Sequence, residues 1–251
     1  LVGSPDHSTR SRASADGARL QMTGLTTDNV TTDNVTTQNA TPPIFDHRFH
    51  AQLAELIAWR RDVRRFRPDP VPDELIDHLL DLAQLSPSVG NSQPWRFVSV
   101  DSPALRGRIH DNFARCNQKA EGLYDGDRAT LYAQLKLEGI AIAPRQFAVF
   151  CDRSTRQGAG VGCQTMPETL DYSVVVMIET FWLAARAHGL GVGWVSILDP
   201  VEAKTDLDVP EPWKFIAYLC VGWPEEEHVD PELVRCGWQP RTHAGRVVIQ
   251  R

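Results

Sequence analysis

The stretch that decides the fold is RRDVRRF at residues 60–66, followed along the chain by PSVGNSQPW at residues 87–95. The first motif gathers several arginines around a single aspartate, Asp62. A guanidinium is a planar fork of donors suited to phosphate oxygens, and several that converge on one spot can hold a phosphomonoester. Taken alone, the cluster also fits a solvated helix end or a salt-bridge network. The choice between these and a phosphate site depends on the other motifs of the chain.

The second motif places small hydroxyl and amide side chains beside Gly90 and then enters an apolar run. Such a loop can present hydrogen-bond donors and acceptors to the edge of a heteroaromatic ring. An ordinary helix-to-strand turn has a similar composition. The loop alone therefore does not indicate a ligand site, and its interpretation depends on the arginine motif that precedes it.

The rest of the chain carries clear apolar periodicities. They predict helices over residues 44–59, 72–86, 102–142 and 172–188, and buried strands over residues 95–100, 147–151, 192–198 and 215–223. The helix at 172–188 is apolar nearly all round, so we expect it to be buried on every side, in a central layer or against a partner chain. Together the elements predict an α+β fold with a central mixed sheet flanked by helices.

The first part of the chain has a different composition. Residues 1–43 are rich in Ser, Thr, Asp, Asn and Gly and include the repeats TTDNV, TTDNV and TTQNA. Such a segment buries too little apolar surface to offset its ordering entropy, so we expect a disordered tail. Leu1 stands where Met would, and Met22 precedes the repeats, a pattern expected if residues 1–21 derive from an expression vector.

The charge balance argues against a nucleic-acid partner. The formal net charge is -6 and the pI is about 5.7, whereas a phosphate-binding face needs clustered Lys and Arg. No apolar segment resembles a membrane span or a signal peptide, so we expect a cytoplasmic protein with no membrane partner. The five cysteines form no CxxC pair, and His47 with His50 is the one close histidine pair, so neither a disulfide framework nor a metal site is indicated.

The joint pattern RR-x-x-R-x-F and PS-x-x-N-x-QPW resembles the signature of the FMN-dependent nitroreductase superfamily. The resemblance implies a nitroreductase-like fold over residues 44–251 and an intertwined homodimer with two flavins at its interface. It also implies that the arginines meet the FMN phosphate and ring edge while the second motif approaches the flavin. The implied flavin-contacting residues are Arg60, Arg61, Asp62, Val63, Arg64, Ser88, Asn91, Gln93, Val195, Ser196 and Arg241.

Further matches make the chain similar to the BluB branch of this superfamily, the 5,6-dimethylbenzimidazole synthases. Asp62 stands where ordinary nitroreductases usually have serine. The pair Asn91-Ser92 departs from the branch, whose members carry bulky apolar residues there, and is more typical of general nitroreductases. The resemblance covers roughly residues 49–242, with matches at LKLEGI (135–140), Ala143-Pro144, CDR (151–153), WLAARAHGLGVGWVSIL (182–198) and GW-x-x-R (237–241).

The branch implies that reduced FMN is itself the substrate, with molecular oxygen as co-substrate. The implied product is 5,6-dimethylbenzimidazole, the lower ligand of cobalamin. Such chemistry needs a site that excludes bulk water. The candidate lid is the segment 116–144, with Tyr124, Leu131, Tyr132 and Leu135.

The two implied catalytic residues are Asp62, which would take a proton, and Ser196, whose hydroxyl would orient the ring. For Asp62, an ion pair with Arg60 or Arg64 is the alternative. For the whole protein, one alternative is an NAD(P)H-dependent nitroreductase or flavin reductase that keeps its FMN, and another is a non-catalytic flavin-binding protein. A separate flavin reductase is one source of reduced flavin that the synthase hypothesis allows.

Overall fold

A computed structural model describes residues 41–242 and 245–251 of the chain. The chain divides into a unit of residues Leu1–Ile44 and a unit of residues Phe45–Arg251. Residues 41–44 are exposed and belong to no helix or strand. The rest of the predicted tail over residues 1–43, including residues 1–21, lies outside the described residues. The fold and the site belong to the second unit.

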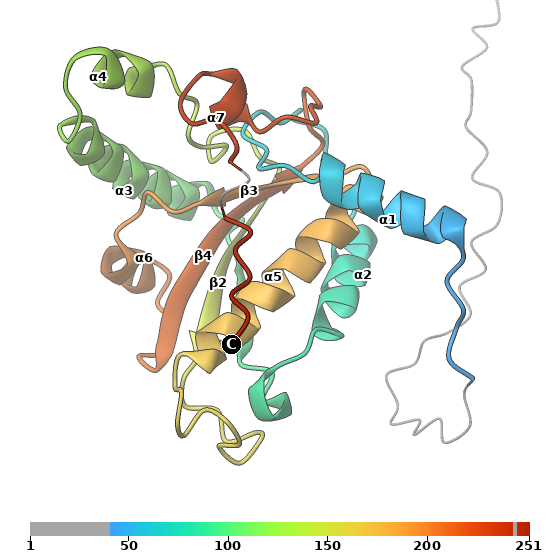
Figure 1. Cartoon of the computed structure of the whole chain (residues 1–251). Coiled ribbons are helices and arrows are strands. Elements are labelled where there is room, and N and C mark those ends of the chain that lie inside the picture. The colour runs from blue at the N-terminus through green and yellow to red at the C-terminus, as the bar shows by residue number, and fades with distance from the viewer. Residues whose placement is uncertain (1–40, 243–244) are drawn as a thin grey trace, which may run out of the picture. The chain divides into compact units, whose positions relative to one another are not determined.

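The centre of this unit is a four-stranded sheet in the order β1-β2-β4-β3 (Figure 1). Neighbouring strands pair antiparallel throughout. The four described strands thus form an antiparallel sheet rather than the predicted mixed one. An isolated parallel bridge between Asp62 and Val192 places the arginine motif at the β3 edge. The strands are β1 (Trp95–Ser99), β2 (Arg145–Asp152), β3 (Gly191–Val195) and β4 (Trp213–Gly222).

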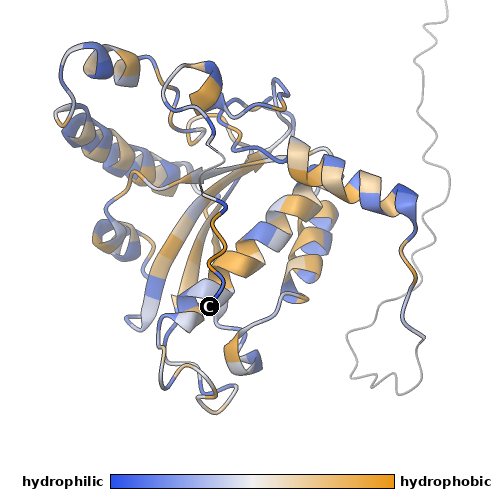
Figure 2. Cartoon of the chain, in the orientation of Figure 1, coloured by the Kyte–Doolittle hydropathy of each residue, from blue (hydrophilic) through white to orange (hydrophobic). Residues whose placement is uncertain are grey.

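Both faces of the sheet are covered, because successive side chains of a strand point to opposite faces. On β2, Phe147 and Val149 join a core formed with α2 (Asp73–Gln84) and α5 (Thr169–Ala187). The alternate residues join a second core, formed with α3 (Pro103–Glu121) and α6 (Pro200–Asp206). Figure 2 shows the hydrophobic colouring running along the strands between these two layers. The double covering explains why these strands read as continuous apolar runs.

The predicted helix over residues 102–142 is wrong in its second half. Helix α3 ends at Glu121 with Gly122 as its C-cap, α4 covers Gly126–Ala133, and residues 134–144 are not helical. Main-chain groups of this last stretch bond to other segments, which overrides its helical pattern. Two short helices, α6 and α7 (Glu232–Arg235), were not predicted, because four to seven residues carry too little periodicity.

The apolar faces of α1 (His47–Trp59) and α5 are not fully covered within one chain. Helix α5 is not a fully buried central layer, the first of the two predicted alternatives, since Tyr172, Val175 and Val176 are 53%, 42% and 43% exposed. The alternative of a partner chain against this face stays a prediction. Helix α1 has no buried residue, although its apolar side chains recur at helical spacing. Exposed apolar faces of this size are a mark of interaction surfaces.

The predicted absences can be stated only for the described part of the chain. None of its helices has the length and apolar character needed to cross a bilayer. In the same ranges no three His, Cys, Asp or Glu side chains gather in a geometry that could hold a metal ion. His47 and His50 are exposed, and all five cysteines are free thiols.

Candidate functional site

The arginine motif leaves α1 at Arg60 and runs beside β3. The Val63 amide donates a hydrogen bond of 3.0 Å to the Val192 carbonyl. This close approach requires glycine in the strand, since a Cβ on Gly193 would lie 2.1 Å from the Val63 carbonyl oxygen. A Cβ on Gly191 would lie 2.7 Å from the Val63 side chain. The G-V-G sequence of β3 is therefore what lets the motif dock on the sheet.

We expect Gly193→Ala to destabilise the protein by about 2 kcal/mol or more, because the clash is with backbone that cannot turn aside. The matched control is Gly107→Ala in α3, where a Cβ meets nothing within 4 Å. That control should be neutral or gain about 0.5–1 kcal/mol from better helix propensity. Urea unfolding measures both free energies, and equal effects of the two substitutions would contradict the docking argument.

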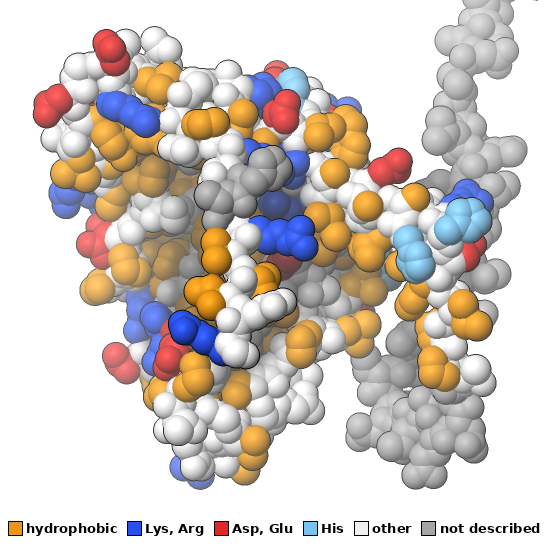
Figure 3. Space-filling model, in the orientation of Figure 1, with side chains coloured by type: hydrophobic (Ala, Val, Ile, Leu, Met, Phe, Trp, Pro, Cys, Tyr) orange, Lys and Arg blue, Asp and Glu red, His pale blue; other side chains and the backbone are white. Residues whose placement is uncertain are grey.

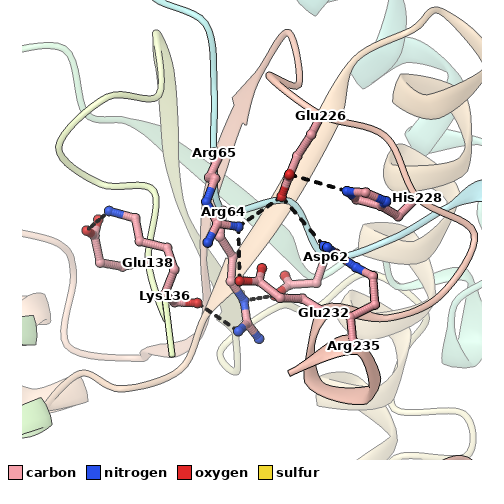
Figure 4. Close-up of polar contacts among 9 residues, drawn as sticks. All are labelled: Asp62, Arg64, Arg65, Lys136, Glu138, Glu226, His228, Glu232 and Arg235. Atoms are coloured by element: carbon pink, nitrogen blue, oxygen red, sulfur yellow. Dashed lines mark hydrogen bonds and ion pairs between the residues drawn. The ribbon is translucent and has the colours of Figure 1, made fainter. Parts of the chain in front are cut away.

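Asp62 is held at the centre of the motif by two hydrogen bonds, of which Figure 4 shows the one with Arg64. Its Oδ1 accepts from the Trp194 amide at 2.8 Å, and its Oδ2 accepts from Arg64 Nε at 2.8 Å. Burial raises the pKa of the Asp62 carboxyl above its ordinary value, against the opposing influence of Arg64 and the Trp194 N–H. The site thus contains a carboxylate that takes up a proton more readily than an exposed one.

Arg64 faces Asp62 and is itself fixed by the chain. Its Nη1 donates to the Lys136 carbonyl at 2.8 Å, and its side chain is only 13% exposed. The structure therefore places Arg64 as the partner of the carboxylate, at the inner end of the motif. The ion pair with Arg64 that the sequence offered as an alternative for Asp62 is present, and it fixes the position of a carboxylate that stays 33% exposed.

The outer arginines form the positively charged part of the site. Burial and the positive charges of Arg241 and Arg60 lower the pKa of Arg61, while Asp230 acts in the opposite sense. The Arg60 guanidinium lies 4.9 Å from the centre of the Trp182 ring. Figure 3 shows Lys and Arg side chains gathered between the C-terminal segment and α1 on the face in view. Guanidinium groups crowded in this way favour an anion, as a phosphomonoester requires.

Arg65 has a different place from its neighbours. It lies 2.9 Å from Glu226 and 3.0 Å from Glu232 (Figure 4). Although burial acts against it, the two glutamates raise the pKa of Arg65. Arg65 is thus neutralised within the protein and anchors the loop that follows β4.

The second motif forms a tightly held loop. The Ser88 hydroxyl accepts from the Gln93 amide at 3.1 Å, and Gln157 Nε2 donates to the Asn91 carbonyl at 2.8 Å and to Gln93 Oε1 at 2.9 Å. Asn91 and Gln93 have φ values of 52° and 43°. Non-glycine residues in this region are strained, and such strain clusters at ligand sites.

The two motifs contact α5 at different places. The Val89 amide donates to the Ser173 hydroxyl at 3.0 Å, whereas the Trp182 indole donates to the Arg61 carbonyl at 3.3 Å. Nine residues of helix separate Ser173 from Trp182, which is about 14 Å along the axis. Within one chain, the arginines and the loop at 88–93 therefore lie toward opposite ends of α5.

The end of β3 supplies the remaining candidates. Val195 is 2% exposed and its side chain packs in the core with Phe66. Ser196 is exposed and follows directly after the strand, two residues from the Trp194 amide that binds Asp62. In extended chain this separation is about 7 Å. Ser196 is thus exposed at the end of the strand whose Trp194 amide binds Asp62.

Sequence reasoning missed several partners in this site. The Lys136 carbonyl and the Trp194 amide are main-chain groups, which no residue type announces. Glu232 and Gln157 are side chains whose role depends on loops folding back onto the motifs. The one signal available was the LKLEGI match, which contains Lys136.

The comparisons with known proteins agree with this geometry. The nitroreductase family model matches residues 57–223. A 5,6-dimethylbenzimidazole synthase of Rhodospirillum rubrum is 60% identical over 201 residues, covering 80% of this chain and 95% of that protein. A second, of Rhodobacter capsulatus, is 47% identical over 195 residues, covering 78% of this chain and 94% of that protein.

Solved structures support the same fold. Iodotyrosine deiodinase bound to FMN and 3-iodo-L-tyrosine superposes with a TM-score of 0.62 at 23% identity, covering 79% of this chain and 97% of that one. A nitroreductase with bound FMN from Desulfitobacterium hafniense gives a TM-score of 0.57 at 18% identity, covering 79% and 97%. At such low identity these likenesses bear on the fold alone. The family match and the two relatives above show that the chain belongs to the nitroreductase family, within the group of the 5,6-dimethylbenzimidazole synthases.

Proposed function

We propose that this protein binds reduced FMN and, with molecular oxygen, converts it to 5,6-dimethylbenzimidazole. The observation that carries the proposal is the Asp62 carboxylate, held between Arg64 and the Trp194 amide with its pKa raised by burial. A site that only binds a phosphate gains nothing from a partly buried negative charge among its arginines. Its sequence relatives with this activity support the same conclusion.

The residues present fit FMN. The crowded guanidinium groups of Arg60, Arg61 and Arg241 suit its phosphate. When bound, reduced FMN supplies an electron-rich ring that reacts with dioxygen. Asp62 accepts a proton at its carboxylate during fragmentation, and the Ser196 hydroxyl orients the ring edge. Arg64 fixes the carboxylate so that it does not swing away from the ring.

We further propose a homodimer in which the apolar faces of α1 and α5 meet a second copy. The faces include Phe49, Leu53 and Ile57 of α1, which are 40%, 41% and 53% exposed. The dimer also accounts for the separated motifs, because the loop at 88–93 of one copy can then complete the arginine site of the other. Asn91 and Gln93 would in that arrangement reach the flavin from the partner.

The phosphate assignment predicts that the protein prefers FMN to riboflavin. We expect Arg61→Gln to weaken FMN binding by about 10- to 100-fold, the equivalent of a hydrogen bond to a charged group. Riboflavin binding should stay unchanged. Arg108→Gln is the matched control, since Arg108 pairs with Asp206 on α6. Calorimetric titration with both flavins measures the effect, and equal affinities of the unaltered protein for FMN and riboflavin would contradict the assignment.

Electron supply separates the proposed synthase from a flavin-retaining reductase. With chemically reduced FMN in air, the proposal predicts that the absorbance of oxidised flavin returns only in part, with a shortfall in proportion to enzyme turnover. With NADH and oxidised FMN, it expects no sustained NADH oxidation unless a separate flavin reductase is added. Continuous NADH oxidation with intact flavin would instead select a nitroreductase or flavin reductase. Tight FMN binding without turnover under either condition would select a flavin-binding protein.

A further inference from the structure

The segment after α7 carries an aromatic anchor that the proposed mechanism does not use. Gly237 has a φ of 74°, and the amides of Gly237 and Trp238 donate to the Val234 and Leu233 carbonyls at 3.0 and 2.9 Å. A glycine in this left-handed conformation ends the helix and redirects the chain. The turn delivers the Trp238 side chain to the region of α4.

Trp238 is held there by contacts to its ring and by a hydrogen bond to its main-chain carbonyl. Its ring meets Tyr124 edge-on at 5.2 Å and Tyr132 at 5.9 Å, and these two tyrosines stack on each other at 4.8 Å. The Arg128 guanidinium lies 4.7 Å from the Trp238 ring, and its Nη1 donates to the Trp238 carbonyl at 2.7 Å. Aromatic and cation–π contacts of this kind each add to the burial they accompany.

The same segment reaches the arginine site at both ends. Glu232 at the start of α7 pairs with Arg65 at 3.0 Å. Arg241 follows Trp238 by three residues, a span of at most about 10 Å of extended chain. Arg241 is exposed, yet its charge acts on Arg61. Trp238 is therefore the fixed point from which Arg241 extends toward the other arginines.

We propose that Trp238 is a positioning residue that holds Arg241 at the FMN phosphate and fastens α4 to the same end of the site. An exposed arginine on a loose chain loses conformational entropy when it binds a phosphate, and anchoring its backbone in advance removes part of that loss. Phosphate affinity is then coupled to the packing of α4. The inference rests on the proposed function, which identifies the anion as the phosphate of FMN.

The test compares FMN with riboflavin by calorimetric titration. We expect Trp238→Leu to weaken FMN binding about tenfold and to leave riboflavin binding unchanged. Trp238→Phe, which keeps an aromatic ring against Tyr124, should retain most of the affinity. Arg128→Met should weaken FMN binding in the same selective way from the α4 side. Gln239→Ala is the matched control between the anchor and Arg241, and should change neither affinity.

A double-mutant cycle of Trp238→Leu with Arg241→Gln measures whether the two residues are coupled in FMN binding. A tryptophan with a purely structural role would show no such coupling. If Trp238 acts through Arg241, the two substitutions together should weaken FMN binding no more than Arg241→Gln alone. Additive effects, or equal losses for FMN and riboflavin, would overturn the inference while leaving the proposed function intact. Failure of the unaltered protein to distinguish FMN from riboflavin would overturn both.

Discussion

Replacing Asp62 with Asn should lower the rate of 5,6-dimethylbenzimidazole formation by about 10²-fold or more, while FMN affinity stays unchanged or rises slightly. The expected loss is that of a general acid or base. The substitution keeps the shape of the side chain and lets its oxygen still accept from the Trp194 amide. It removes the charge and the ability to take a proton. Removing a negative charge from among arginines does not weaken their attraction for a phosphate.

The matched control is Asp230→Asn, which removes a carboxylate of equal charge. Asp230 is exposed between β4 and α7, and its charge also acts on Arg61. Its rate should equal that of the unaltered protein. The pH profile adds a second readout. Because burial raises the pKa of Asp62, the rate should fall on acidification at a less acidic pH than an ordinary carboxyl would dictate, and this limb should vanish in Asp62→Asn. Loss of flavin binding, with normal conversion of whatever flavin still binds, would make Asp62 an organiser of the arginines only.

Leu53→Asp in α1 should produce a monomer that neither retains FMN nor converts it. Leu53 is 41% exposed in the single chain and lies on the face proposed to meet a second copy. A two-fold interface receives the substitution twice, and an unpaired buried charge costs several kcal/mol each time. Activity should fall by at least about 10²-fold, because the loop at 88–93 then no longer completes the site of its partner.

Light scattering measures the mass, and calorimetry measures the flavin affinity of the same sample. Val201→Asp is the matched control, since Val201 on α6 is 71% exposed and lies outside the α1 and α5 faces. That variant should remain a dimer with full activity. A Leu53→Asp monomer that binds and converts FMN normally would show that each chain carries a complete site.

The sequence predicted the buried sheet well, because its strands are covered on both faces and read as short apolar runs. Helix α5 was also found from its periodicity, within three residues at its start. Its apolar composition predicted a covered outer face but did not reveal whether the covering surface belongs to the same chain or to a partner. The same holds for α1. The helical spacing of its apolar side chains indicates that some surface covers them, but it does not indicate which surface.

The sequence predicted the residue types of the site but not the hydrogen bonds that join them. The arginine motif and Asp62 are recognisable in the sequence by their residue types. The Trp194 amide that binds Asp62 is 132 residues away along the chain, and the strand register brings it to the carboxylate. Arg64 illustrates the limit, because every arginine of the motif looks equally suited to a phosphate. Only the fold distinguishes Arg64, which binds Asp62 and the Lys136 carbonyl, from Arg61, which donates to main-chain carbonyls and lies near the charges of Arg60 and Arg241.

Identification of the products of a single turnover separates flavin fragmentation from flavin retention. The protein is mixed with chemically reduced FMN, exposed to air, and the products of a single turnover are identified by mass spectrometry. We expect 5,6-dimethylbenzimidazole in proportion to enzyme, with FMN consumed and far less product in the Asp62→Asn sample. Quantitative recovery of intact oxidised FMN, with no benzimidazole from the unaltered protein, would contradict the proposed function.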